Sequence, residues 1–497
     1  MRLRFQQQLS IDSFPIPDVT FPLKSRDEMP PVLKALHFIF ITPELSEKVF
    51  ALLEDKINKG KQDTGRKGMD LWHILVLSVV RHALDTNWDR LAYLANYDAL
   101  LRRVLGLRTP DEVDEDNLDF SAQNLRDNVR LLDEDLLREI NSIVADAGHK
   151  LLKKKEQEEP IRLKTDTYAV EVNVHFPTDL NLLWDSVRKC LDCIGFLNLE
   201  IPIYGWRKLA MLRRTLKSTF RSTSQQVFKG KKEEAKKQSV TGYLELCKMI
   251  TKKSEITFAT VAPFATKPSI VKACAELNDF IAYAKKHIDL VNRRLLKGEV
   301  IPAEEKIYSI FEPHAEWLSK GKLNKKVELG HLTMITTDTQ HYIVDYKVLE
   351  DQRDAAQVPS LTDRLKEKYA EKKIYSHSFD KGFFSKVNYE ALEKANIEHI
   401  ILPKKGKKNK VETERESTEE FKLLRNKHSA VESNINMLEH HGLNKCVDKG
   451  IEGFKRSVGL SVLAYNLHIL GNKLIAIEKE ALKKKALRKA SRWKAAA

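Results

Sequence analysis

The hydrophobic pattern changes at Ile161 from a helical to a strand-like period, and this change most restricts how the chain can fold. Alternating residues from Ile161 to Val174 predict a strand, whereas the following stretch to about residue 300 has the spacing of helices. Strand-like runs return at "VELGHLTMITTD" and "HYIVDYKVLE", which are separated by a short polar turn and predict a hairpin. We therefore expect a sheet whose sequence is interrupted by a long helical insertion.

Helices and strands alternate after the hairpin. The patterns predict a helix near 360–372, a strand at "KIYSHSF", a helix at "SKVNYEALEKAN", a strand at "HIILPK" and a long helix that carries Glu432 and ends at Gly442. Without the insertion, the order is strand, strand, strand, helix, strand, helix, strand, helix. This order predicts an α/β core.

The chain of 497 residues exceeds what a single core usually supports, so several domains are expected. Helical periodicity dominates before Ile161, and the charged stretch "KKKEQEEP" is typical of a hinge. The expected parts are an extended N-terminal arm at 1–30, a helical DNA-binding or dimerisation domain at 31–155, a split α/β domain at 156–180 and 305–470, a basic helical insertion at 181–304, and a basic C-terminal helix at 471–497.

The net charge of +15 and the pI near 9.3 favour a polyanionic partner, although a merely basic soluble protein would have the same charge. The positive charge gathers between Arg207 and Lys237, where eleven Lys or Arg residues stand against two acids. No apolar run approaches the roughly 18 residues that span a bilayer, and the start "MRLRFQQQLSIDSF" lacks a signal-peptide core. We therefore expect a cytoplasmic, nucleoid-associated protein with no membrane contact.

The five cysteines are an odd number in a chain without a secretory signal, which indicates reduced thiols. Cys190 and Cys193 form a CxxC motif, but no second cysteine pair or histidine pair at zinc spacing follows. Hydrophobic residues around the motif have helical spacing. A helix with two buried thiols is therefore favoured over a zinc site.

Three acids lie on three different elements of the expected core. Asp166 lies in the first strand, Asp380 at the C-terminal end of the fourth, and Glu432 on the last helix. Ligand sites gather at strand ends in α/β sheets. Carboxylates without soft ligands suit Mg²⁺, and two such ions about 3.5–4 Å apart can activate a water and stabilise the leaving oxygen of a phosphodiester. The three acids therefore predict a metal site for phosphodiester chemistry.

Each acid also has a structural interpretation. Asp166 fits a surface strand residue, and Asp380 fits the cap of the next helix, although Ser385 is better placed as the N-cap. Glu432 fits a solvated helical acid beside a buried stripe. The argument for a site therefore rests on the three acids together.

The residues after Asp380 fit the same setting. We expect Gly382 to let the chain turn sharply off the strand and pass close to the metal. We expect the aromatic pair Phe383 and Phe384 to fall back onto the core. Asp380 would then lie at a strand end because the substrate does.

Four segments together resemble bacterial insertion-sequence transposases of the DDE class, which have a ribonuclease H-like catalytic core. They are "KTDTYAVEVNVHFPTDLNLLWDSVR", "SIFEPHAEWLSKGKLNKKVELGH", "FDKGFFSKVNYEAL" and "RNKHSAVESNINMLEHHGLNKCVDKGIEGFKRSVGLSVLAYNLHILG", and the resemblance covers most of residues 66–471. It implies that Asp166, Asp380 and Glu432 form a catalytic triad that binds two Mg²⁺ ions, for which Mn²⁺ could substitute. It also implies cleavage at the terminal inverted repeats of the element and joining of the 3′-hydroxyls to target DNA.

The sequence departs from this family around Glu432. Related families often carry a tyrosine and an arginine shortly before the glutamate and a lysine seven residues after it, where this chain has Arg425, His428 and Glu439. The phosphate contacts of the family are therefore not transferred to this helix. Arg425 and His428 are DNA-contact candidates by position alone.

The basic insertion fits a DNA clamp, because Lys and Arg contacts to phosphate supply most non-specific affinity. The candidate DNA contacts in the insertion and in the loop "KKGKKNK" are Arg207, Lys208, Arg213, Arg214, Lys217, Arg221, Lys404, Lys405 and Lys407. Trp206 and Phe220 could stack on an unpaired base, but core positions in a helical subdomain are favoured. Arg66 and Lys67 are expected at a helix start near phosphate.

Three functional classes remain open from the sequence. A transposase would cleave and join double-stranded DNA at the element ends and at the target, and pairing two ends implies at least a homodimer. A ribonuclease H-like nuclease would share the acids and cut without joining. A domesticated regulator would bind DNA without turnover. The tail from Lys483 to Lys494 is either a DNA- or partner-contacting helix or a solvated one.

Overall fold

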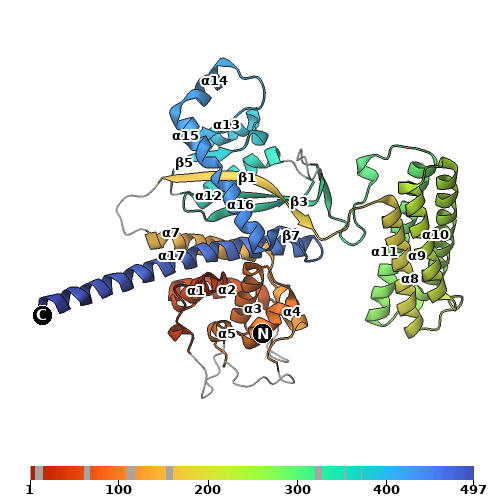
Figure 1. Cartoon of the computed structure of the whole chain (residues 1–497), viewed down its shortest axis with the longest axis horizontal. Coiled ribbons are helices and arrows are strands. Elements are labelled where there is room, and N and C mark those ends of the chain that lie inside the picture. Colours follow the sequence, from red (N-terminus) through yellow and green to blue (C-terminus); the bar gives the residue numbers. More distant parts are fainter. Residues whose placement is uncertain are drawn as a thin grey trace. The chain divides into compact units, whose positions relative to one another are not determined.

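The computed structural model describes residues 2–5, 15–60, 68–108, 118–152, 160–319, 327–351, 354–370 and 372–496. It contains two compact units, one formed by Met1–Asn173 with Leu318–Ala497 and the other by Val174–Trp317 (Figure 1). Arg66, Lys67 and most of the "KKKEQEEP" stretch lie outside the described residues. Each unit has its own hydrophobic core.

The N-terminal part of the first unit is helical, as expected. Its helices are α1 (Met29–Ile41), α2 (Pro43–Asn58), α3 (Leu71–Ala83), α4 (Trp88–Tyr97), α5 (Ala99–Val104), α6 (Ala122–Val129) and α7 (Glu134–Leu152). Helix α3 is buried nearly all round, from Leu71 to Ala83 with only His73 partly exposed, so it is a core helix. In the expected arm, Ile16, Val19 and Phe21 are buried.

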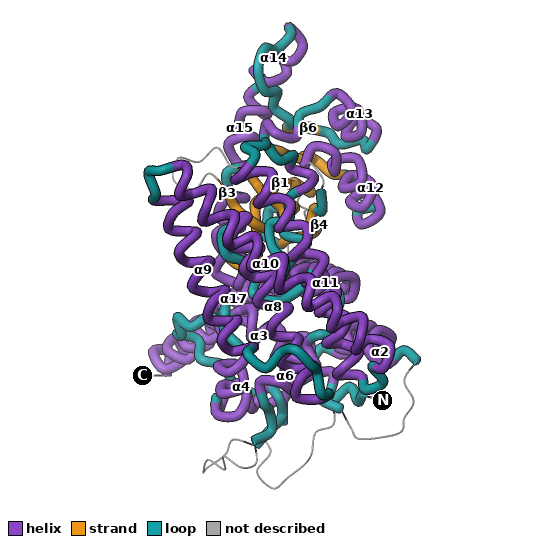
Figure 2. Tube along the Cα trace, turned by 90° about the vertical axis from the view of Figure 1, so that its right-hand side faces the viewer, coloured by secondary structure: helices purple, strands orange, loops and turns teal. Residues whose placement is uncertain are grey.

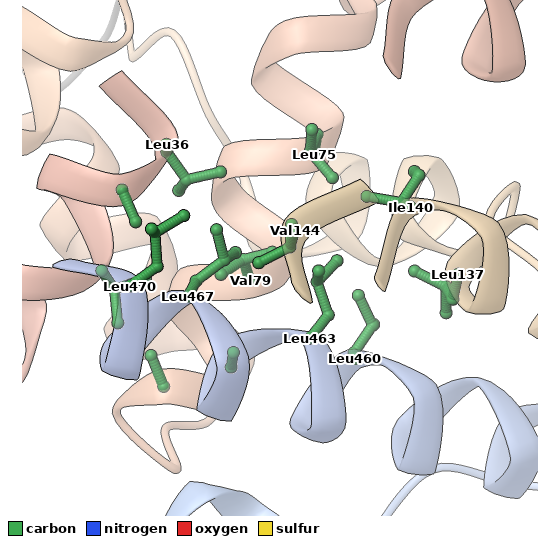
Figure 3. Close-up of a cluster of buried hydrophobic side chains, with 14 of the residues drawn as sticks. Leu36, Leu75, Val79, Leu137, Ile140, Val144, Leu460, Leu463, Leu467 and Leu470 are labelled. Atoms are coloured by element: carbon green, nitrogen blue, oxygen red, sulfur yellow. The ribbon is translucent and has the colours of Figure 1, made fainter. Parts of the chain in front are cut away.

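A long C-terminal helix, α17 (Ile451–Ala496), joins these helices into one core. Figure 3 shows its leucines interleaved with side chains of α1, α3 and α7. The labelled residues are Leu36, Leu75, Val79, Leu137, Ile140, Val144, Leu460, Leu463, Leu467 and Leu470. The position expected to begin a separate basic helix, residue 471, lies inside α17, because the helix continues without a break.

Helix α17 is the one described helix that is long and apolar enough to cross a membrane, with a mean hydropathy of 1.3 over its best window. That window is 61% buried within the protein. Its apolar character therefore matches a core helix, and the expectation that no run reaches this length was too strict.

The sheet has the strand order β2-β3-β1-β5-β6, β4 also pairs with β3, and β7 pairs with the end of β1. The strands are β1 (Ile161–Val172), β3 (Val327–Thr337), β4 (Ile343–Leu349), β5 (Ile374–Phe379), β6 (His399–Ile401) and β7 (Lys445–Cys446), and a short β2 (Glu316–Ser319) lies at the unit boundary. β3 and β4 form the expected antiparallel hairpin, while β1 runs antiparallel to β3 and parallel to β5. This mixed sheet is compatible with a ribonuclease H-like core.

The two faces of the sheet meet different helices. Leu163 points into the core that includes residues of α12 (Val358–Lys368) and α13 (Lys386–Lys394). Because side chains alternate along a strand, Asp166 belongs to the other face, where α15 (Glu419–His428) contacts β5 and α16 (Ala430–Leu438) contacts β1.

The single helix expected before Gly442 is broken into α14 (Lys410–Ser417), α15 and α16, followed by a π-helical turn. Side-chain caps explain the first two starts. The Asn409 side chain accepts from the Glu412 amide in a capping box, and Thr418 Oγ1 accepts from the Phe421 amide at 3.3 Å. Helical periodicity continues through such breaks, so the sequence pattern did not reveal them.

The second unit is a helical bundle built from α8 (Asp179–Glu200), α9 (Leu209–Lys229), α10 (Glu233–Val261) and α11 (Pro268–Val291), as Figures 1 and 2 show. Cys190 and Cys193 are buried free thiols on α8, as favoured over zinc. Trp206 is 3% exposed, and its indole N–H donates to Thr257 Oγ1, which makes it a core residue. Phe176 and Trp317, at the two ends of the unit, pack with ring centroids 5.7 Å apart.

A buried ion pair connects α3 to the chain just before α17. Arg81 forms two hydrogen bonds with the Asp448 carboxylate, at 2.9 and 3.0 Å, and the two side chains are 4% and 13% exposed. The guanidinium also lies 4.0 Å from the ring centroid of Trp88. Paired charges of this kind hold the N-terminal helices against the end of the sheet.

We expect the substitution Asp448→Ala to lower the free energy of unfolding by about 3–5 kcal/mol, because it leaves the Arg81 charge buried without its partner. Urea denaturation followed by circular dichroism measures this. The matched change Glu390→Ala removes an exposed partner of Lys386 and should cost below about 0.5 kcal/mol. Equal effects of the two changes would contradict a buried, coupled pair.

Candidate metal centre

The pairing of β1 with β5 places two of the three predicted acids beside each other. Lys164 pairs with Ser378 and Thr165 with Phe379, so Asp166 and Asp380 occupy the next position on adjacent strands. Neighbouring strands lie about 4.8 Å apart. Asp380 follows immediately after the last residue of β5, as the sequence predicted, and its side chain is exposed.

Helix α16 brings the third acid to the same face. Glu432 lies in its first turn, and the helix contacts β1. The side chain of Glu432 is exposed, while Val431 and Leu438 on the same helix are buried. The apolar side of α16 therefore packs inward and leaves Glu432 free to face a ligand.

The three acids interact electrostatically. Burial, together with the negative charges of Asp380, Glu432 and Asp354, raises the pKa of Asp166 to about 6. Only a hydrogen bond from the Thr167 amide to Asp166 Oδ1, at 2.7 Å, opposes this shift in pKa. The hydrogen bond therefore offsets only part of the effect that burial and the neighbouring negative charges have on Asp166.

Asp354 is a fourth acid that the sequence analysis missed. It lies in a short 3₁₀ turn (Asp354–Gln357), and its Oδ2 accepts a hydrogen bond from Thr167 Oγ1 at 2.8 Å. Thr167, the residue that follows Asp166, thus links Asp354 to β1. The surrounding sequence "EDQRDAAQ" has no strand or helix period, so no pattern in it indicated a place at the site.

The donor chemistry at this face suits a hard divalent cation. Asp166, Asp380 and Glu432 offer carboxylate oxygens, which Mg²⁺ prefers, and a positive charge there would offset the burial and the mutual repulsion that together raise the pKa of Asp166. Within the described residues, no three Asp, Glu, His or Cys side chains already stand close enough to enclose an ion. The residue types therefore fit the metal, while the side chains do not form a ready-made cage.

His428 holds the helix layer against β5. Its Nδ1 is hydrogen bonded to Ser378 Oγ at 3.0 Å, and Ser378 lies two residues before Asp380. Burial lowers the pKa of His428 to about 4, so the imidazole is neutral near pH 7. This bond joins α15, the helix before the one that carries Glu432, to the strand that precedes Asp380, and the DNA contact of His428 stays a prediction.

A second polar network lies on the opposite face of the same strands. Thr165 Oγ1 is 2.7 Å from both Thr336 Oγ1 and His377 Nε2, which links β1, β3 and β5. Burial lowers the pKa of His377 to about 3, so this ring is neutral as well. These bonds fix the three strands at the level of Asp166.

The residues after Asp380 were only partly predicted. Ser385 caps α13 by accepting from the Asn388 amide, and Phe383 is buried with Phe384 packed against the core, as expected. The argument for Gly382 was wrong. Its φ is not positive and a Cβ there would meet nothing within 4 Å, so the turn does not require glycine.

The candidate DNA contacts fall into two groups. Arg213 bonds to the Leu191 carbonyl and to Asp192, and Lys404 pairs with Glu412, so both are engaged within the protein. The exposed candidates are Arg207, Lys208, Arg214, Lys217, Arg221, Lys405, Lys407 and Arg425. Arg214, Lys217 and Arg221 lie at positions i, i+3 and i+7 of α9, so they share one face of that helix.

Comparison with known proteins gives one match. Residues 300–467 match the family model described as "Transposase DDE domain". Asp380 and Glu432 lie inside the matched residues, whereas Asp166 precedes them on the far side of the insertion. No curated protein and no solved structure matches the chain.

We expect Asp166→Asn to stabilise the metal-free protein at pH 7.5 by roughly 1–3 kcal/mol, since one pKa unit corresponds to about 1.4 kcal/mol. The folded pKa of Asp166 near 6 exceeds the unfolded value near 3.9, so stability is lost as the pH rises through 6. The difference between the two proteins should vanish near pH 4. Urea denaturation in EDTA at both pH values tests this, and a less stable variant at pH 7.5 would contradict it.

We expect Ser378→Ala to weaken Mg²⁺ binding by about 10-fold or more, because it removes the bond that joins His428 to β5. The measurement is the rise in melting temperature as Mg²⁺ is titrated. Ser378→Thr keeps the hydroxyl and should retain most of the affinity, and Ser417→Ala on the exposed end of α14 is a matched control. Unchanged Mg²⁺ affinity in Ser378→Ala would disprove the role of this bond.

Proposed function

We propose that the chain is a DDE transposase of the insertion-sequence type, which binds the terminal inverted repeats of its own element, cleaves the DNA strands and joins the 3′ ends to target DNA. The match of residues 300–467 to a transposase DDE domain supports this proposal. Asp166, Asp380 and Glu432 are the proposed catalytic residues. The observation that carries the proposal is the β1–β5 register, which sets Asp166 beside Asp380 on the face that α16 covers with Glu432. Two of these acids lie in the matched domain, and the third is brought to them by the sheet.

We assign the same three acids as ligands of two Mg²⁺ ions, for which Mn²⁺ is a substitute. A pair of ions there would activate the attacking hydroxyl and stabilise the leaving oxygen of the phosphodiester. The oxygen-only donor set and the raised pKa of Asp166 support this assignment. The negative charge of Asp354 also acts on Asp166.

The protein's own residues orient and support the reaction. The His428–Ser378 bond fixes the helix layer of Glu432 relative to the strand of Asp380, and the Thr165 network fixes β1 between β3 and β5. The site needs no residue that becomes covalently attached to DNA, because the nucleophile is first water and then the 3′-hydroxyl. A trapped protein–DNA adduct would contradict this mechanism.

Double-stranded DNA is the proposed partner, and the exposed cations of the second unit are its proposed contacts. Arg214, Lys217 and Arg221 present one positively charged face of α9. Contacts of this kind supply affinity that falls steeply with salt and carries little sequence information. A homodimer or larger assembly would hold the two element ends together, in the cytoplasm where the DNA is.

The decisive experiment compares the wild type with Glu432→Gln on labelled DNA that carries the element end. We expect cleaved and joined products from the wild type with Mg²⁺ and none in EDTA. Glu432→Gln should lose at least about 100-fold in rate, because it removes a proposed ligand of the metal. Denaturing gels resolve the products.

Glu414→Gln, on the exposed side of α14, is the matched control and should leave both reactions unchanged. Cleavage without any joined product in the wild type would favour a nuclease. Binding of the end DNA without cleavage in any divalent metal would favour a non-catalytic regulator.

A further inference from the structure

A pocket of about 220 Å³ opens on the sheet face that carries the acids. It is lined by Arg162, Lys164, Ser376, Ser378 and Lys427, together with Leu163, Thr339, His341 and Leu424. Most of these residues come from β1, β5 and α15, and Thr339 and His341 come from the turn between β3 and β4. None of the described residues that line the pocket is acidic.

The side chains around this pocket are positively charged. Lys164 is partly buried and lies near the charge of Lys427. The acid near Lys164 is Asp338, whose carboxylate already accepts hydrogen bonds from the Gln340 and Tyr342 amides and contacts His149. The ammonium groups of Lys164 and Lys427 would therefore attract an anion in the pocket, because the nearby carboxylate of Asp338 is already hydrogen bonded to other groups.

Arg162 adds a third cation to the pocket wall. Its guanidinium lies 4.9 Å from the ring centroid of Tyr375, and its Nε is buried without a hydrogen-bond partner among the described residues. Ser376 and Ser378 contribute hydroxyl groups from the same edge of β5. Cations and hydroxyl donors that converge from two strands and a helix are the groups that bind phosphate oxygens.

The register places this pocket at a definite distance from the acids. Lys164 and Ser378 pair with each other, and each lies two residues before Asp166 and Asp380, respectively. Two residues along a strand span about 6.6 Å. One strand of duplex DNA advances about 3.4 Å per nucleotide, so a phosphate in the pocket would lie one or two nucleotides from the phosphate at the acids.

We propose that this pocket binds a backbone phosphate of the DNA strand that is being cut, one or two nucleotides from the reacting phosphate. The inference rests on the proposed function. Lys164 and Lys427 supply the charge, and Ser376 supplies a neutral donor. The pocket thus fixes the strand along β1, and the acids act on the neighbouring phosphate.

The test replaces single phosphates of the end DNA with uncharged methylphosphonates within three nucleotides of the mapped cleavage position. Binding is measured in EDTA for the wild type, Lys164→Met and Lys427→Met. One or two replacements should weaken wild-type binding about 5- to 10-fold, and the same replacements should have no further effect on either variant. Each variant should also reduce the slope of log affinity against log salt by about 1.

Lys386→Met, on the exposed surface of α13, is the matched control and should respond to each methylphosphonate as the wild type does. Lys427 is exposed, so its variant remains informative if Lys164→Met folds poorly. If the methylphosphonates weaken the wild type and both variants equally, the pocket does not bind the phosphate and the proposal is overturned.

Two further measurements separate this inference from the proposed function. If the wild type cleaves and joins DNA but no single methylphosphonate affects the wild type and the Lys164 and Lys427 variants differently, the pocket proposal alone is overturned. A wild type that shows no cleavage overturns the proposed function. In that case, thermal stabilisation by inorganic phosphate that is lost in both variants would support an anion pocket, and equal stabilisation in all proteins would refute it.

Discussion

The arrangement of the candidate site depends on the hydrogen-bonded ladder between β1 and β5. Backbone pairing fixes which residues stand side by side, and a shift of one position would send Asp166 to the opposite face of the sheet. The ladder continues from Lys164 with Ser378 to Thr165 with Phe379. Side-chain bonds from Thr165 to Thr336 and His377 reinforce it across three strands. The relative position of the two aspartates is therefore determined mainly by backbone pairing.

This arrangement has a cost in stability. Several buried polar atoms on these strands have no hydrogen-bond partner within the described protein, among them Tyr168 Oη, Thr333 Oγ1, Thr337 Oγ1 and His377 Nδ1. An unpaired buried group typically costs about 1–3 kcal/mol. The raised pKa of Asp166 adds a further penalty near neutral pH. Unfavourable contributions to stability are commonly found at functional sites. Here the large apolar core around α17 offsets them.

The sequence predicted much of the order of elements because hydrophobic period and turn residues act locally. It located β1, the hairpin of β3 and β4, the end of β5 at Asp380, and the cap at Ser385. It also placed the three acids on the elements where the structure has them. These features follow from alternation, capping and strand length, which are readable without tertiary contacts.

Other features could not be read from local pattern. The contact between His428 and Ser378 joins residues fifty positions apart, and Asp354 reaches the site through Thr167, which precedes it by 187 positions. The breaks at Thr418 and Ser429 keep the helical period, so they left no mark in the pattern. The argument from Gly382 failed because a glycine was assumed to mean strain, whereas its backbone is ordinary. Tertiary packing decides these points.

The contact between Phe176 and Trp317 bears on how such a chain reaches its folded state. β1 must pair with strands that are synthesised after the whole second unit, and closing a flexible loop of that length costs about 4 kcal/mol of chain entropy. The second unit has its own core, and its two ends meet at these rings. Once that bundle has folded, residues 176 and 317 are already together, so β1 and β3 find each other as though they were near neighbours in sequence. The insertion that interrupts the sheet in the sequence thereby shortens the search that completes it.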